Sequence, residues 1–293
     1  MLIKELESIS ILGLGLLGGS VGLAINRSFP RIRRAGYSHR QATRQKALAA
    51  GVVDAIYPTV AGAVAEAQLI ILASPIGVFE KLMRQMMGNL PKDCVVTDVG
   101  STKVLPVSMA KRIFKKKGVF VGSHPMAGSE QQGVEFARAD LFDDAHCIIT
   151  PSEKSPKSAV SLLTQLWQAL GMRVCTMSPA AHDRVLARIS HLPHVLAMTL
   201  MNCSDPQQML LCGKGFLDTT RIASGPPAIW RDILSANAGL TAAAIKQIIK
   251  ELSHVQVILE KGDDKAVLKM LSKAQSRRNK LVEQKLKRKE LPT

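Results

Sequence analysis

A glycine-rich segment near the start of the chain has the spacing of a phosphate-binding turn. The segment GLGLLG follows an apolar, strand-like run and opens a helical pattern. Gly13 permits a tight turn, Gly15 lets a pyrophosphate approach the backbone, and Gly18 lets helix and strand pack closely. The N–H groups at the helix start, including those of Leu16 and Leu17, would then bind the phosphates. The pattern predicts a dinucleotide site, and the alternative is a glycine-rich turn without a ligand.

The end of the second predicted strand bears on which dinucleotide would bind. Residues 33–37 are followed by Ser38, His39 and Arg40. A site for NAD usually carries an acidic residue where Ser38 stands, and that residue would repel a 2′-phosphate. Ser38 can instead donate a hydrogen bond, and Arg40, with His39 and Arg44 nearby, can neutralise the phosphate. These residues predict NADP as the preferred cofactor, with NAD as the alternative. The other interpretation is that Arg40 and Arg44 simply lie on the exposed face of a helix and bind no phosphate.

Three loops after predicted strands carry further polar residues. Ser74 and Pro75 follow the strand at 69–72, the segment DVGSTK contains Ser101, and the segment GSHPMAG contains His124. Ligands of doubly wound sheets bind at the carboxyl ends of the strands, so these loops should converge on one crevice. A histidine there can act as a general base, because its pKa lies near neutral pH, and Ser101 can orient it. A lone loop histidine is more often structural, and the residues alone leave both roles open.

These motifs require a parallel sheet to position them. Short apolar runs alternate with helical patterns up to about residue 178, which predicts a doubly wound Rossmann-type α/β domain over residues 1–178. A helix over Ser158–Leu170 and a strand over Arg173–Met177 are expected to extend the same sheet. The other strands are expected at Ile9–Leu14, Arg33–Tyr37, Leu69–Leu72, Val95–Asp98, Val119–Gly122 and Cys147–Thr150.

Residues 179–293 have a different pattern. Apolar residues recur there with a helical period over 181–201, 226–252 and 266–286, and no convincing strand is present. The pattern predicts an all-α domain. Its Ala- and Leu-rich faces exceed what one thin bundle would bury, so we expect a homodimer through this domain.

The composition argues against several classes of protein. Apolar residues make up 46% of the chain and charged residues 21%, which is typical of a globular protein. No run of eighteen apolar residues occurs and the N-terminus does not resemble a signal peptide, so we expect a cytoplasmic protein without membrane contact. The net charge is +16, but the basic C-terminal stretch has no aromatic residue for base stacking. A positive field suits anionic small molecules, and nucleic-acid binding is not expected.

Disulfides and metal sites are not expected either. The five cysteines are scattered and form no C-x-x-C pair. His191 and His194 are three residues apart on a predicted helix, but no carboxylate or cysteine completes a set of ligands.

Five segments together resemble the prephenate/arogenate dehydrogenases, a family that forms the aromatic ring of tyrosine by oxidative decarboxylation. They occur in the family order from residue 9 to about 233 and read ILGLGLLGGS, DVGSTK, GSHPMAG, SHLPH and GFLDTTRIASGPPAIWRDI. The resemblance implies that His124 is the catalytic histidine at the hydroxyl of the substrate ring and that Ser101 assists it. It also implies a nicotinamide cofactor and either prephenate or arogenate as the substrate.

The resemblance further implies which residues bind the substrate. Arg221 corresponds to an arginine that binds a substrate carboxylate, for which a planar guanidinium is well suited. His194 and Trp230 match positions that line the substrate pocket, and His182 matches a further family histidine, expected to contact the substrate. Leu217 stands where family members often carry a basic residue, so that contact departs from the family pattern.

Two other interpretations stay open at this point. One is another dehydrogenase with a Rossmann and a helical domain, of the 3-hydroxyacid or imine-reducing type, although those lack a loop like GSHPMAG. The other is a non-enzymatic, NADP-sensing regulator, which would turn over no cyclohexadienol and would bind nucleic acid in a salt-dependent way.

Overall fold

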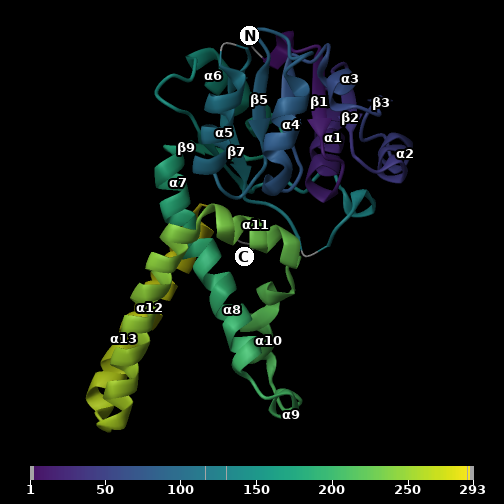
Figure 1. Ribbon diagram of the computed structural model, residues 1–293. Helices are drawn as coiled ribbons and strands as arrows, with labels where there is room; N and C mark the ends of the chain where they lie inside the picture. Colours follow the sequence, from purple (N-terminus) through teal and green to yellow (C-terminus); the bar gives the residue numbers. More distant parts are fainter. Residues whose placement is uncertain (1–2, 116, 130, 289, 291–293) are drawn as a thin grey trace. The chain divides into compact units, whose positions relative to one another are not determined.

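A parallel six-stranded sheet forms the first layer of the computed structural model, which describes residues 3–115, 117–129, 131–288 and 290. Its strand order is β3-β2-β1-β4-β5-β6, and every neighbouring pair is parallel. This is the order of a dinucleotide-binding Rossmann sheet, so the predicted fold class is confirmed. The strands are β1 (Ser8–Leu12), β2 (Arg33–Tyr37), β3 (Ala55–Ile56), β4 (Leu69–Leu72), β5 (Val95–Asp98) and β6 (Val119–Phe120) (Figure 1).

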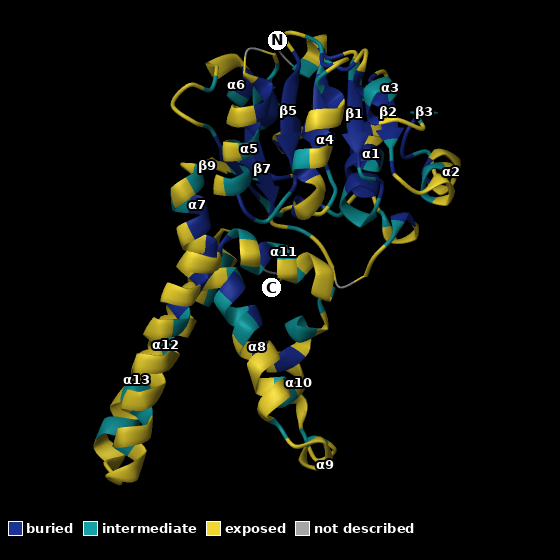
Figure 2. Cartoon of the chain, viewed as in Figure 1, coloured by how far each residue is buried: buried dark blue, intermediate teal, exposed yellow. Residues whose placement is uncertain are grey.

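Helices cover both faces of this sheet, which explains why its central strands read as unbroken apolar runs. All four residues of β4 are buried: Leu69 and Ile71 pack into one core cluster, and Ile70 and Leu72 into the other. The neighbouring strand β5 is also buried along its whole length (Figure 2). The α-helices between the strands are α1 (Leu16–Ser28), α2 (Gln41–Ala49), α3 (Val60–Val64), α4 (Phe79–Met86), α5 (Val104–Phe114) and α6 (Lys157–Ala169). Short 3₁₀ turns lie at η1 (Ile3–Glu5), η2 (Ile76–Val78) and η3 (Val134–Phe136).

A second, three-stranded sheet corrects one prediction. The strands β7 (Gly122–Pro125), β8 (His146–Thr150) and β9 (Arg173–Thr176) form a sheet of their own, with β7 antiparallel to β8. The expectation that the last strands extend the Rossmann sheet is therefore wrong. The physical reason lies at Ser123, whose backbone N–H and carbonyl are bound by side chains instead of continuing the ladder of β5 and β6.

The segment after β9 is helical as far as the structure describes it, as expected. Ser178 caps α7 (Pro179–Leu186) by accepting a hydrogen bond from the N–H of Ala181 at 3.2 Å. A π-helical turn, η4 (Ala187–His191), joins α7 to α8 (Leu192–Cys203), where the sequence predicts one regular helix. Three short elements follow before α11 (Pro227–Ala236), namely α9 (Pro206–Met209), α10 (Lys214–Thr220) and η5 (Arg221–Ser224).

By its internal contacts the chain divides into two compact units, Met1–Ala238 and Gly239–Thr293. The smaller unit consists of α12 (Ala238–Glu260) and α13 (Asp264–Lys287), and Asp263 caps the second of these helices. The predicted boundary between residues 178 and 179 falls between β9 and α7 and stays a prediction. In the part of the chain that is described, no helix has both the length and the apolar character needed to cross a membrane.

Candidate active site

A single cavity brings together residues from distant parts of the unit Met1–Ala238. It has a volume of about 530 Å³ and lies at the carboxyl ends of β1, β4 and β5. Eight residues singled out from the sequence line it: Gly15, Leu16, Leu17, Ser74, Pro75, Ser101, Arg221 and Trp230. The dinucleotide turn therefore faces the same space as Arg221 and Trp230, more than two hundred positions later in the sequence.

The glycine turn has the shape that a pyrophosphate requires. Gly13 has φ +114°, and a Cβ there would lie 2.5 Å from the carbonyl oxygen of Ala73. A Cβ on Gly18 would lie 1.8 Å from the carbonyl oxygen of Gly13, whereas a Cβ on Gly15 would meet nothing within 4 Å. Gly15 precedes α1, and no side chain caps that helix. Two glycines thus close the turn, and the third leaves open space beside uncapped N–H groups, so the turn fits a dinucleotide.

The end of β2 carries the residues predicted to select the cofactor. Ser38 is buried, and Nη1 of Arg44 donates a hydrogen bond to its backbone oxygen at 2.6 Å. His39 and Arg40 are exposed, and the Arg40 side chain forms no ion pair with a described residue. Arg44 is therefore tied to the backbone, while Arg40 remains available to a phosphate.

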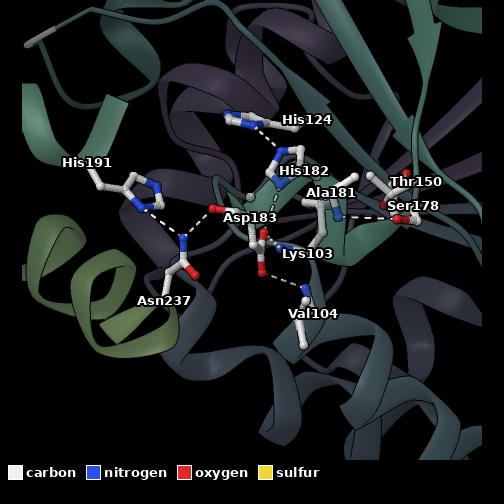
Figure 3. Close-up of polar contacts among 12 residues, drawn as sticks. Lys103, Val104, His124, Thr150, Ser178, Ala181, His182, Asp183, His191 and Asn237 are labelled. Atoms are coloured by element: carbon white, nitrogen blue, oxygen red, sulfur yellow. Dashed lines mark hydrogen bonds and ion pairs between the residues drawn. The ribbon is translucent and has the colours of Figure 1, made fainter. Parts of the chain in front are cut away.

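His124 lies on β7 and not in a loop, which corrects the expectation from the sequence. Its Nδ1 is 2.8 Å from Nε2 of His182, and Nδ1 of His182 is 2.8 Å from Oδ1 of Asp183 (Figure 3). His124 keeps 7% of its surface exposed and His182 none, and neither residue is among those that line the cavity. Burial, together with the charges of neighbouring groups, lowers the pKa of His124 well below its usual value. The imidazole is therefore neutral at neutral pH, the state that a general base requires.

Asp183 ties the histidine pair to the start of α5. Its Oδ1 accepts a hydrogen bond from the N–H of Lys103 at 2.7 Å, and its Oδ2 accepts one from the N–H of Val104 at 2.9 Å. Burial alone would raise the pKa of this carboxyl, but the hydrogen bonds from His182, Val104 and Lys103 outweigh burial and hold it below its usual range. Asp183 is therefore an ionised carboxylate.

A buried ion pair lies beside this network. Nζ of Lys103 contacts Oδ2 of Asp98 and donates to the backbone oxygen of Ser123 at 2.8 Å, and both charged side chains are fully buried. Asp98 also accepts from the N–H groups of Gly100 at 2.9 Å and Ser123 at 3.2 Å. Burial raises the pKa of Asp98 and lowers that of Lys103, and their mutual attraction opposes both shifts. Ser101 follows this anchored loop and lines the cavity, without a described hydrogen bond to His124.

Residues of η5 and α11 also line the cavity. Arg221 is exposed, lines the cavity and pairs with no described carboxylate. Trp230 stacks on the imidazole of His194, with ring centroids 3.5 Å apart and planes 10° apart. His194 is buried behind this tryptophan, so Trp230 lines the cavity and His194 does not, although the sequence predicted both there. Leu217 is 57% exposed on α10.

The structure places His182 differently from the expectation. It does not line the cavity, and both of its ring nitrogens have partners within the protein, so it has no free polar atom for a substrate.

A further buried histidine lies near this network. Nδ2 of Asn237 donates to the backbone oxygen of Asp183 at 2.8 Å and lies 3.1 Å from Nδ1 of His191. Burial lowers the pKa of His191 to about 4. No group of three potential metal ligands occurs within the described ranges.

Both halves of the chain match models of one protein family. Residues 21–176 match the model described as prephenate dehydrogenase, nucleotide-binding domain. Residues 178–273 match the model described as prephenate dehydrogenase, dimerization domain. Together these matches account for most of the chain.

Individual relatives agree with the family models. A prephenate dehydrogenase of Bacillus subtilis is 34% identical over 94% of this chain and 76% of its own length. A cyclohexadienyl dehydrogenase of Zymomonas mobilis is 30% identical over 93% of this chain and 95% of its own. A solved prephenate dehydrogenase of Aquifex aeolicus, in complex with hydroxyphenyl propionate and NAD+, has a TM-score of 0.87 at 30% identity and covers 94% of this chain and 98% of its own.

Enzymes of the rival dehydrogenase type share only the fold. A 3-hydroxyisobutyrate dehydrogenase of Salmonella typhimurium has a TM-score of 0.57 at 13% identity, covering 82% of this chain and 87% of its own. A Synechocystis arogenate dehydrogenase, by contrast, reaches 0.81 at 26% identity and covers 94% of this chain and 99% of its own.

The glycine turn gives a first testable prediction, with Gly15→Ala and Gly18→Ala as a matched pair. Gly18→Ala forces a methyl against the carbonyl of Gly13, so it should lower the melting temperature by several degrees, since overpacking costs about 1–3 kcal/mol. Gly15→Ala meets no protein atom, so it should melt like the wild type but bind a dinucleotide more weakly. Thermal denaturation and calorimetric titration measure both effects. Equal melting temperatures for the two variants would contradict this account.

Proposed function

The chain belongs to the prephenate dehydrogenase family, and from that premise we propose how its residues divide the work and which cofactor it prefers. It is a nicotinamide-dependent dehydrogenase that oxidatively decarboxylates prephenate or arogenate in tyrosine biosynthesis. The observation that carries the assignment of roles is the cavity, because it joins the dinucleotide turn at Gly15 to Arg221 and Trp230.

The reacting ring carries a hydroxyl and, opposite it, a carboxylate. A bound nicotinamide would supply the hydride acceptor for the hydroxyl-bearing carbon. His124 takes up the hydroxyl proton, since it is a neutral, buried imidazole with a small exposed edge. The bond to the ring carboxylate then breaks, CO₂ leaves, and the electron pair left behind makes the ring aromatic with a phenolate oxygen. The phenolate takes the proton back from His124 and becomes a phenol, so the protein mainly has to position the ring and hold the proton between the two steps.

The remaining residues hold the substrate and the cofactor. Arg221 binds a substrate carboxylate through its unpaired guanidinium, and Trp230, stacked on His194, supplies a flat wall for the ring. Ser101, beside the anchored loop of Asp98, assists at the hydroxyl. The segment matched to the dimerization model carries exposed leucines on α12, so we propose a homodimer through residues 179–293.

NADP is the proposed preferred cofactor, because the end of β2 offers Ser38 and the unpaired Arg40 and no carboxylate at that position. The kcat/KM for NADP should exceed that for NAD. Arg40→Ala should reduce this preference by about 1–3 kcal/mol, the size of a charge-assisted hydrogen bond. Arg31→Ala, at another exposed arginine, is the matched control and should leave the preference unchanged. Equal use of both cofactors by the wild type would refute the proposal.

His124 is tested by His124→Asn. The variant should lose roughly 10²–10⁴-fold in kcat, the usual contribution of a general base, with little change in dinucleotide affinity. His254→Asn, at an exposed position of α12, controls for loss of a histidine as such. Steady-state rates with prephenate and with arogenate measure the effect. Near-normal turnover of His124→Asn with either substrate would show that another group is the base.

Arg221 is tested by Arg221→Ala and Arg221→Lys. Loss of a carboxylate contact should raise KM steeply for the substrate and leave cofactor affinity unchanged. Lysine should restore little, because a point charge cannot reproduce a two-pronged guanidinium contact. The alternative, an exposed arginine of no functional importance, predicts an unchanged KM and a melting temperature within the range of exposed substitutions. Measuring both quantities on the same variants separates the two.

A further inference from the structure

Three residues from two distant segments form a continuous hydrogen-bonded chain, from His124 on β7 through His182 to Asp183 on α7 (Figure 3). We propose that His182 and Asp183 hold His124 in the tautomer whose Nε2 is free to accept a proton, and that they stabilise the positive charge His124 then acquires. The proposal rests on the proposed role of His124 as the base. It assigns a positioning role to both residues, because both ring nitrogens of His182 and both carboxylate oxygens of Asp183 are bound to groups inside the protein.

Asp183 determines which atom is the donor in each hydrogen bond of this series. Its two oxygens accept hydrogen bonds from the backbone N–H groups of Lys103 and Val104, which can only donate. These groups stand at the start of α5, an eleven-residue helix whose N-terminal dipole favours a negative charge. An ionised carboxylate accepts hydrogen bonds and donates none. Nδ1 of His182 must therefore carry a hydrogen and donate it to Asp183.

The proton on Nδ1 of His182 fixes the proton on His124. His182 is fully buried, and burial is the largest influence on its pKa, which lies below the usual value, so the ring is neutral at neutral pH. A neutral imidazole carries one hydrogen, so Nε2 of His182 is an acceptor. Nδ1 of His124 must then be the donor across the 2.8 Å contact. The lone pair of His124 is left on Nε2, which has no hydrogen-bond partner among the described residues.

His182 and Asp183 also stabilise the positive charge of a protonated His124. An imidazolium at this buried position is disfavoured by burial and by the nearby ammonium of Lys103. Asp183 supplies an opposite charge through His182, which remains hydrogen-bonded to the cation. The titratable and charged groups around the pair are Asp98 on β5, Lys103 before α5, Cys147 on β8, Asp183 on α7 and His191 on η4.

Asp183 also caps α5, so a substitution there would mix folding with chemistry. The ring of His182 is hydrogen-bonded to His124 and Asp183 and forms no described hydrogen bond with that helix end, which makes His182 the better position to test. His182→Leu removes the acceptor for His124. His182→Gln keeps a polar side chain whose carbonyl oxygen can accept from Nδ1 of His124 but cannot form a cation. His254→Gln, at an exposed histidine of α12, is the matched control.

We expect kcat to fall roughly 10²–10³-fold in His182→Leu, by analogy with the loss of the orienting carboxylate in a catalytic triad, and less in His182→Gln. KM for the substrate should change less than threefold in both variants. The acidic limb of the kcat/KM profile should move to lower pH in His182→Leu. Without the acceptor the imidazolium loses its stabilisation, so the pKa of His124 falls, and a base with a lower pKa stays unprotonated to lower pH.

A purely structural role would lower the melting temperature and leave the position of the pH limb unchanged, and that result would overturn the proposal. Nitrogen NMR of wild-type enzyme labelled in histidine gives an independent reading that does not depend on a buried variant folding. His124, identified by the signal missing from His124→Asn, should carry its hydrogen on Nδ1. A hydrogen on Nε2 instead would also overturn the proposal. Full turnover by His124→Asn would remove the base assignment itself, which is a different and separately visible failure.

Discussion

The buried ion pair between Asp98 and Lys103 is the constraint on which the site depends. Burying a charged side chain away from water costs several kcal/mol of folding free energy, unless a partner charge and hydrogen bonds compensate for the lost solvation. Here Asp98 accepts from Gly100 and Ser123, and Lys103 donates to Asp98 and to the backbone of Ser123. The pair therefore joins the end of β5, the loop that carries Ser101, the start of α5 and the strand β7 at one point. His124 follows Ser123 directly, so its position is set by the same four hydrogen bonds.

This constraint also explains where sequence patterns succeeded and failed for the fold. The unbroken apolar runs of β4 and β5 predicted a covered parallel sheet, because such strands are buried on both faces. The pattern around Val119 predicted a strand but could not name its partner. Ser123 leaves the first sheet because Asp98 and Lys103 occupy its backbone groups, and β7 then pairs with β8. Periodicity reports which residues are buried and carries no information about side-chain bonds to a strand's backbone.

The residues of the site likewise fall into those that the sequence could predict and those that it could not. The glycine turn could be predicted because its function depends on local backbone geometry that three glycines encode by themselves. The carboxylate of Asp183 could not, since its importance arises only where α7 meets the start of α5. His182 illustrates the difference: its family match suggested a substrate contact, whereas its two ring nitrogens are both used inside the protein. The π turn at Ala187–His191 likewise interrupts what the spacing of apolar residues presents as a regular helix.

The charges of the buried network suit the reaction that surrounds it. Asp98 and Lys103 cancel each other, and His124, His182 and His191 are neutral because burial lowers the pKa of each. Asp183 is then the one uncompensated charge, a carboxylate kept ionised by two backbone N–H groups. The network as a whole is one proton short of neutrality. Hydride loss frees the hydroxyl proton, and the phenolate that follows decarboxylation takes a proton back, so the site must hold one proton between the two steps. A single buried negative charge behind a neutral imidazole favours holding that proton on His124 over its release into an apolar cavity.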